Sequence, residues 1–285
     1  MRLSARMLIL VVVLIAAGVG AAWPWFTAAD DSALRVQEAG GEVTRDRAGA
    51  LEAAEAGALL EAGDRVSTGV DGFAVLGRPD GASVRLGGGT SVQIAAVAED
   101  ALEIELERGQ VRARVRRAGE TVVVGNQGRR VSASSGEVAV SITSDGVLGA
   151  QASDGAEVSG VVGVTTLASG ERVVVSADGA AAAFRPTAEP LLDVRWPGTT
   201  AAASVSVVGT TEPGATVRFL RPAGPVEVRA DNGGKFELAL ELVEGEQEVE
   251  VLVTDLFGGT RRATAKIVRD TKGPAVKVQL DYGRR

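Results

Sequence analysis

Two stretches of the chain alternate apolar and charged residues with a period of two, and this pattern constrains the fold more than any other feature. Residues 101–117 read ALEIELERGQVRARVRR, with apolar residues opposite glutamates first and opposite arginines later. Successive side chains of a strand point to opposite faces, so each half predicts a strand with one buried face. We expect Gly109 and Gln110 to form a turn between these two strands.

The same alternation is clearest near the end of the chain, in KFELALEL and QEVEVLVTD. We expect residues 243–246 to join these two strands as a hairpin. About seven short strands with turn signals between residues 203 and 270 are typical of an immunoglobulin-like sandwich. The residues expected to face its core are Phe236, Leu238, Leu240, Leu242, Val249, Val251 and Val253.

Glycine is abundant, with 37 residues in the chain, and Gly87–Gly89 raises the question of a phosphate-binding loop. Such a loop needs a lysine directly after its last glycine and a helix behind it. Here Thr90 and a strand-like stretch follow, and the first lysine is Lys235. We therefore interpret the glycines as turns between short strands, and we predict an all-β fold.

Composition divides the chain into segments. We predict a first β domain over 34–180, a linker over 181–202, a second β domain over 203–270 and a tail over 271–285. Three of the nine prolines, Pro186, Pro190 and Pro197, fall in the expected linker, which favours an extended and fairly stiff connection.

The N-terminal segment 7–26 carries no charge and follows Arg2 and Arg6. A helix of that length spans about 30 Å, enough to cross a bilayer. We expect a single-pass anchor in a bacterial inner membrane, with 1–6 as a cytoplasmic stub and the bulk of the chain in the periplasm. A cleaved signal peptide, which would export the whole body, is the alternative.

The chain has no cysteine and no histidine, so thiolate zinc sites, disulfides and histidine-activated nucleophiles are excluded. A net charge of −7 argues against nucleic acid as a partner. We predict no catalytic residue, no cofactor and no metal site, and hence no enzyme. Calcium stays open, because β-domain loops can bind it through oxygens; turn roles are favoured for Asp231, Asn232, Asp255 and Asp270.

A row of arginines follows the glutamates of the first alternating stretch. Two roles are open for it: an anionic partner such as a phosphate-bearing glycan, or pairing with a neighbouring acidic strand, for instance the glutamates across the expected turn. We favour pairing. The arginines are Arg112, Arg114, Arg116 and Arg117, and the glutamates are Glu103, Glu105 and Glu107.

The stretch LLEAGDRVSTGVDGFAVLGRPDGASVRLGGGTSVQI, followed by the Arg-Gly pair of LERGQV, resembles the FecR domain family over roughly 34–180. The shared pattern is Gly-Asp, Thr-Gly, a glycine before an alternating strand, Asp-Gly and Val-Arg-Leu. The positions that carry this pattern, expected to be structural, are Gly63, Asp64, Thr68, Gly69, Gly72, Asp80, Gly81, Arg85, Arg108 and Gly109.

This resemblance implies an extracytoplasmic β-roll or solenoid-like domain without catalytic residues. Well-known members regulate sigma factors through a cytoplasmic anti-sigma segment, for which residues 1–6 are too short. The segment 203–270 is similar to bacterial immunoglobulin-like domains of the cell envelope. We therefore expect a non-enzymatic, membrane-anchored scaffold or binding module that contacts protein or envelope glycan. A periplasmic sensor of FecR type, acting in signalling through a separate cytoplasmic output protein, is the alternative.

Overall fold

The computed structural model describes residues 33–221 and 224–271, and within these ranges it contains 24 strands and no helix. The expected all-β fold is confirmed. No helix in the described ranges is long and apolar enough to cross a membrane. The predicted stub 1–6, the anchor 7–26 and nearly all of the tail 271–285 lie outside the described residues.

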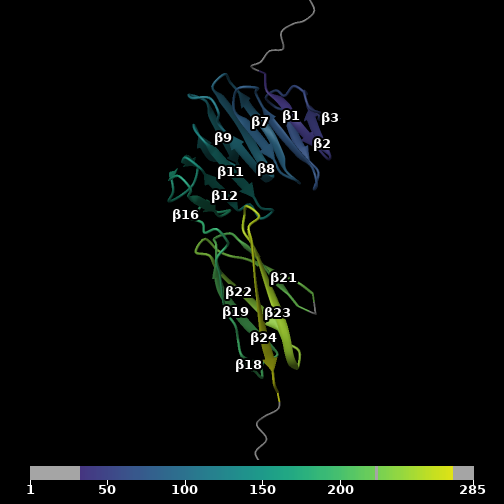
Figure 1. Cartoon of the computed structure of the whole chain (residues 1–285), viewed down its shortest axis with the longest axis vertical. Helices are drawn as coiled ribbons and strands as arrows, with labels where there is room; N and C mark the ends of the chain where they lie inside the picture. Colours follow the sequence, from purple (N-terminus) through teal and green to yellow (C-terminus); the bar gives the residue numbers. More distant parts are fainter. Residues whose placement is uncertain (1–32, 222–223, 272–285) are drawn as a thin grey trace, which may run out of the picture.

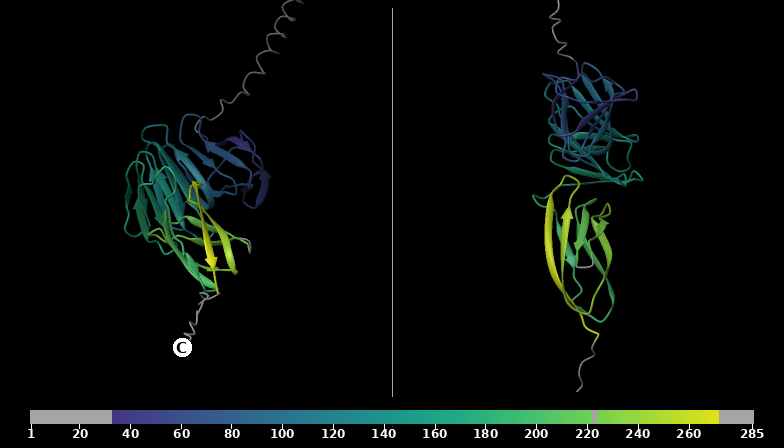
Figure 2. Two further views of the ribbon diagram at one scale, coloured as in Figure 1. Left: turned by 60° about the horizontal axis from the view of Figure 1, so that its bottom comes forward. Right: turned by 90° about the vertical axis from the view of Figure 1, so that its right-hand side faces the viewer.

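The strands form two sandwiches that lie end to end, with β1 and β18 near opposite ends of the molecule (Figure 1). The right-hand view of Figure 2 shows the same separation. The first sandwich is one 16-stranded sheet folded into two layers. Its first layer is antiparallel and runs, in spatial order, through β1 (Arg35–Gly40), β5 (Phe73–Gly77), β6 (Ser83–Leu86), β8 (Ala101–Arg114), β11 (Glu137–Ile142), β12 (Leu148–Ala152), β15 (Arg172–Val175) and β16 (Ala181–Phe184).

The second layer also contains β8 and is antiparallel except for the parallel pair β8–β9. The chain switches repeatedly between the two layers, so the connections resemble those of a roll. In spatial order, the second layer consists of β3 (Ala50–Ala53), β2 (Val43–Arg47), β4 (Arg65–Thr68), β7 (Ser91–Val97), β8, β9 (Thr121–Asn126), β10 (Arg129–Ala133), β13 (Ala156–Ser159) and β14 (Thr166–Leu167).

Strand β8 belongs to both layers, which corrects the predicted turn at Gly109 and Gln110. Its residues 101–108 pair in the second layer and its residues 109–114 in the first. Gly109, with a φ of 89°, marks the crossing. Strands that pass from one sheet of a sandwich to the other commonly do so at a bend of this kind.

The crossing shifts the buried register of β8 by one residue. Before Gly109 the even-numbered apolar residues of β8 are buried, and after it the odd-numbered ones. The predicted inward faces of both halves are confirmed. All these side chains join one hydrophobic core between the two layers: Leu102, Ile104, Leu106, Val111, Ala113 and Val115.

The second sandwich packs a three-stranded sheet on a five-stranded one around a separate core. The ring centroid of Phe219 lies 6.2 Å from that of Phe236 and 6.3 Å from that of Trp196. The predicted core faces of 236–242 and 249–253 are confirmed, while assignment to the immunoglobulin-like class is not. In spatial order the strands are β17 (Leu192–Arg195), β19 (Ser204–Thr211) and β22 (Lys235–Glu241), then β18 (Thr199–Thr200), β24 (Thr260–Arg269), β23 (Gly245–Thr254), β20 (Thr216–Leu220) and β21 (Val226–Arg229).

Two local expectations differ from the structure. Residues 243–246 do not close a hairpin, because β22 pairs with β19 in one sheet while β23 pairs with β20 and β24 in the other. The residues between Glu241 and Gly245 form an arch between the layers, and Gly245 and Glu246 already belong to β23. The segment 181–202, expected to be a linker, contains β16 of the first sandwich and β17 and β18 of the second. Only the chain between Phe184 and Leu192 connects the two sandwiches.

Candidate functional site

The Gly-Asp motif, Gly63 and Asp64, stabilises the turn that precedes β4. Asp64 is 2% exposed and accepts hydrogen bonds from Nε and Nη2 of Arg47, both at 2.7 Å, and from the backbone N–H of Glu61. The Arg47 guanidinium holds the pKa of this carboxyl below its usual range. Gly63, with a φ of 95°, turns the chain just before it. This aspartate ties β4 to β2.

The Thr-Gly motif and Gly87–Gly89 form one interlocked pair of turns. The Thr68 hydroxyl donates to the carbonyl of Gly87 at 2.6 Å and accepts from the backbone N–H of Thr90. A Cβ on Gly88 would lie 2.0 Å from the carbonyl oxygen of Val70, and one on Gly72 would lie 2.5 Å from that of Glu42. Gly88 therefore packs backbone against backbone, and Gly88 and Gly89 form a turn between β6 and β7, as predicted.

The Asp-Gly motif closes the hairpin between β5 and β6 above a buried ion pair. Asp80 is exposed, and Gly81 lies with its Cα next to Glu120. The Glu120 side chain is fully buried, 3.3 Å from Nη1 of Arg78, and it accepts the backbone N–H of Ala82 at 2.7 Å. Arg78 also donates to the carbonyls of Ala98, Glu99 and Ala101.

The remaining motif residues lie along β6 and β8. Arg85 is exposed, with its guanidinium 4.6 Å from the centre of the Phe73 ring, and Arg108 is exposed opposite Ser91. The structure therefore spreads the ten motif residues over several turns and three strands and does not gather them into one pocket.

The acidic loop residues of the second sandwich cap turns. Asp231 Oδ1 accepts the backbone N–H groups of Gly233 and Lys235, and Asp255 Oδ1 accepts those of Phe257 and Gly259. Within the described ranges no group of three or more acidic side chains converges as a metal ion would need. The calcium hypothesis gains no support from these contacts.

The two sandwiches meet around Arg172, whose side chain is 13% exposed. Arg172 on β15 donates through Nη1 to Glu212 at 2.8 Å and to Asp255 at 2.9 Å, and its guanidinium lies 4.7 Å from the centre of the Phe257 ring. Burial raises the pKa of Glu212, while the charge of Arg172 opposes that rise. Both carboxylates are almost fully buried, so this contact excludes water.

Further contacts surround this arginine. Arg229 donates to Asp145 at 2.8 Å, and Asn232 donates to the hydroxyl of Ser176. The Leu256 side chain packs on Gly149, where a Cβ would come within 2.7 Å of it. The interface therefore combines charge, hydrogen bonding and close apolar packing, which holds the two sandwiches in one arrangement.

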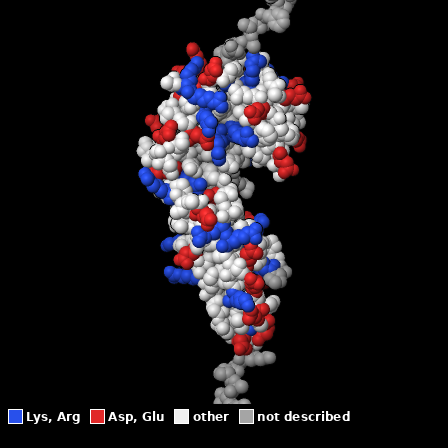
Figure 3. Space-filling view, in the orientation of Figure 1, with Lys and Arg blue, Asp and Glu red and all other residues white. Residues whose placement is uncertain are grey.

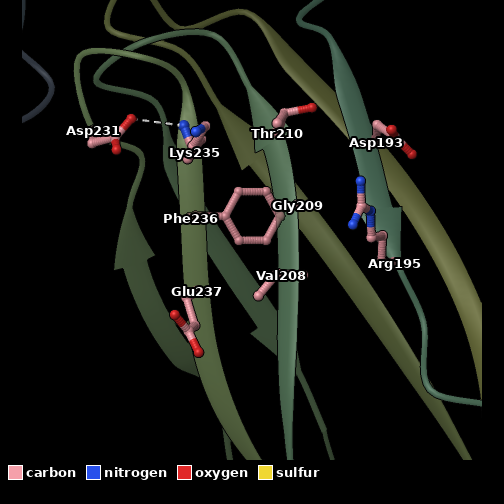
Figure 4. A pocket seen from close by; sticks show the side chains of 9 residues that line it. All are labelled: Asp193, Arg195, Val208, Gly209, Thr210, Asp231, Lys235, Phe236 and Glu237. Atoms are coloured by element: carbon pink, nitrogen blue, oxygen red, sulfur yellow. Dashed lines mark hydrogen bonds between the residues drawn. The ribbon is translucent and has the colours of Figure 1, made fainter.

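A groove of about 510 Å³ lies on the outer face of the sheet β17–β19–β22 (Figure 4). The register aligns Asp193, Thr210 and Lys235 in one row across the three strands, and Arg195, Val208 and Glu237 in the next. Two cations and two carboxylates thus alternate over an apolar floor. The charged side chains of this groove suit the binding of a polar ligand.

Arg112 and Arg114 pair with the neighbouring strand β11 through Glu137, at 3.3 and 2.8 Å, as the favoured interpretation expects. The glutamates of β8, offered as the example of such an acidic strand, are not their partners. Glu103 pairs with Arg130 at 2.9 Å and Glu107 pairs with Arg65 at 2.6 Å, both on the second layer. Arg112 and Arg114 lie on the first layer because β8 crosses at Gly109. The space-filling view shows basic side chains gathered over the first sandwich (Figure 3).

Comparison with known protein families finds a match for part of the first sandwich. Residues 64–164 match the family of the FecR protein. The match begins at Asp64 and spans most of the two-layered core, including β8, but it covers less than half of the 285-residue chain. The resemblance to FecR, drawn from the motifs, is confirmed for these residues. No curated protein matches the chain.

Solved structures show only distant similarity. A "putative anti-sigma factor" from Parabacteroides distasonis ATCC 8503 is 21% identical, with 42% of this chain and 59% of that chain covered and a TM-score of 0.37. Fibronectin(III)-like modules of Clostridium thermocellum CbhA are 15% identical, with 66% and 100% covered and a TM-score of 0.25. A Ca²⁺-stabilized, ice-binding adhesin of an Antarctic bacterium is 15% identical, with 83% and 66% covered and a TM-score of 0.24. At these scores none assigns a fold or a function.

Sequence reasoning missed the buried charged residues that organise the FecR region and its junction. Each of these residues stands at the end of a short β-like run, where exposed residues also stand, so the sequence does not distinguish them. They are Arg78, Glu120, Arg129 and Arg172. Arg129 is 6% exposed and donates to the carbonyl of Gly146 at 2.9 Å and to Asn126; burial lowers its pKa. The one usable signal was Pro79-Asp80-Gly81, which predicts a turn next to Arg78. It gives no indication that Glu120 is the partner of Arg78.

Proposed function

We propose that the chain is a non-catalytic sensor or regulator of FecR type, whose β sandwiches lie outside the inner membrane and bind a partner there. The match of residues 64–164 to the FecR family supports this proposal most directly. Residues 7–26 anchor the chain in the membrane, with the N-terminus in the cytoplasm. In this proposal the signal passes to a separate cytoplasmic output protein.

The surfaces of the described residues support binding over catalysis. The groove on β17–β19–β22 and the basic face of the first sandwich both expose charged side chains without a nucleophile and base in contact. The second sandwich, which we propose to be a bacterial immunoglobulin-like domain, is held against the first by Arg172. It extends the binding surface at a fixed angle.

A scaffold that only displays these domains in the cell envelope, in contact with protein or glycan, is the second candidate. The same two surfaces would serve it. The two candidates differ in one respect: a regulator changes transcription when it is removed, whereas a scaffold does not.

The test is deletion of the chromosomal copy followed by transcript sequencing. We expect a small set of transcripts to change and to recover when the full chain is restored. A chain with residues 34–180 deleted, but with 1–33 and 181–285 intact, should not restore them. Unchanged transcripts after deletion would contradict the regulator and favour the scaffold. The mass of the mature N-terminus separates an anchor from a cleaved signal peptide.

A further inference from the structure

Strands β6 and β8 place two arginines directly opposite each other. Arg85 and Arg112 are register partners in this antiparallel pair, and both side chains are exposed. Opposed residues of an antiparallel pair have Cβ atoms about 5 Å apart, where like charges are destabilising. The fold therefore keeps an unfavourable pair on the outer face of its first layer.

One carboxylate, that of Glu137, forms ion pairs with both Arg112 and Arg114. Glu137 on β11 contacts Nε of Arg112 at 3.3 Å through one oxygen and Nη2 of Arg114 at 2.8 Å through the other. Arg85 contacts no carboxylate among the described residues, and its guanidinium lies over the Phe73 ring. Two of the three arginines thus share one acid and the third has none, so the local charge stays positive in a chain whose net charge is −7.

The glutamates of β8 do not neutralise this face, because their side chains lie on the second layer. Glu103 and Glu107 pair with arginines of the second layer. Glu105, on the same layer, lies against Gly125, where a Cβ would come within 2.3 Å of its Oε1 atom. The crossing of β8 at Gly109 separates these acids from the arginines, so no rotation of side chains can bring them together.

A concavity of about 270 Å³ lies between the opposed arginines. Gly87, Gln110 and Val111 line it together with Arg85 and Arg112. Guanidinium groups donate several hydrogen bonds in a fixed plane and suit carboxylates. A carboxylate in this concavity would meet both guanidinium groups and relieve their repulsion.

We propose that this face, defined by Arg85, Arg112 and Arg114, binds an extended acidic segment of a partner protein. Alternate residues of a strand are about 6.6–7 Å apart, which is also the spacing from Arg112 to Arg114 along β8. A carboxylate at one position of an extended segment enters the concavity, and one two residues along meets Arg114. This inference rests on the proposed function in one respect, because it takes the ligand of the arginine face to be a partner protein.

An anionic membrane surface fits this face less well. Lipid headgroups respond to the number of cations and not to their register, and Glu137 lies among these arginines and repels phosphate. The in-register pair and the small concavity favour a single carboxylate on an ordered backbone.

The test is fluorescence anisotropy of a labelled ten-residue peptide with glutamate at alternate positions, titrated with the full chain in detergent solution. We expect saturable binding that weakens with added salt, and little binding of the same peptide with glutamine in place of glutamate. The double variant Arg85→Gln/Arg112→Gln should bind at least about tenfold more weakly, since two charge-assisted contacts are lost. The matched control Arg262→Gln, an exposed arginine of β24, should bind like the parent.

A folding defect is separated from a binding defect by the thermal unfolding midpoint. Because the opposed charges destabilise the free chain, the double variant should unfold at the same temperature as the parent or higher. Equal peptide affinity of parent and double variant would overturn the proposal. So would a double variant that loses binding to phosphatidylglycerol vesicles while keeping peptide binding.

The proposed function can fail while this inference holds, and this inference can fail while the proposed function holds. Peptide binding that depends on Arg85 and Arg112, with no transcript changed by deletion, would leave the acidic-segment site standing and remove the regulator. Equal peptide affinity of parent and double variant, with transcripts that change on deletion and recover with the double variant, would remove the site and leave the regulator.

Discussion

Thr90 and Gly109 meet where β8 passes from one layer of the first sandwich to the other. A Cβ on Gly109 would lie 2.6 Å from the Cα of Thr90, and the Thr90 hydroxyl bonds both the N–H and the carbonyl of Gln110, each at 3.1 Å. The threonine thus holds the backbone of the crossing, and the missing side chain of the glycine makes that approach possible.

Gly109→Ala should destabilise the chain by about 3 kcal/mol or more, because it combines a left-handed backbone with a clash against Thr90. The matched control is Gly119→Ala: Gly119 has a φ of 83° and open space around it, so it should lose only roughly 1 kcal/mol. Urea unfolding of both variants measures the difference. Equal losses would mean that the contact with Thr90 contributes nothing.

Glu120→Gln should cost about 3–5 kcal/mol, because it leaves the Arg78 charge buried and uncompensated. The comparison variant is Glu250→Gln, which breaks an exposed pair with Arg262 and should cost less than about 1 kcal/mol. Chemical unfolding measured at pH 7 gives both values. A loss at Glu120 no larger than that at Glu250 would show that the buried pair is not needed for stability.

Arg172→Met should uncouple the two sandwiches, since Glu212 and Asp255 would remain buried without their cation. Calorimetry of the parent should show one transition, and the variant should show two, with a total enthalpy close to that of the parent. Arg218→Met, at an exposed arginine of β20 paired with Glu227, provides the control and should keep one transition. Two transitions already present in the parent would contradict coupling through this arginine.

Asp64 should make stability sensitive to acid. Its folded pKa is lowered, so its contribution is complete above its unfolded pKa of about 4 and is lost as pH falls through that value toward the folded one. Asp64→Asn should therefore lower the unfolding free energy at pH 6, and this deficit should shrink at pH 3. The control Asp80→Asn changes an exposed turn residue and should show no pH-dependent deficit. A deficit at Asp64 that is constant with pH would exclude the charge as its cause.

Glycine turns and alternation made the class of this fold predictable, but not the partners of its strands. The faces of 102–106 and 236–242 follow from alternation alone, since a period of two fixes which side chains are buried. Alternation does not say which strand lies alongside, so the hairpin expected at 243–246 is an arch. Gly109 shows the same limit: a left-handed glycine suits a turn and a sheet crossing equally well.

The candidate surfaces were harder to foresee than the fold. The arginine row was visible, yet its neutralisation depended on whether β8 turned back or continued into the other layer. Arg172 precedes a short valine run, as several exposed residues do, and only the docked second sandwich reveals its burial. Long-range pairing of this kind leaves no local trace in a single sequence.

The contacts around Arg172 have a mechanical consequence. Because Arg229, Asn232 and Leu256 also join the two sandwiches, the short stretch between Phe184 and Leu192 need not be stiff to keep them aligned. The two sandwiches should therefore reorient in solution as one body.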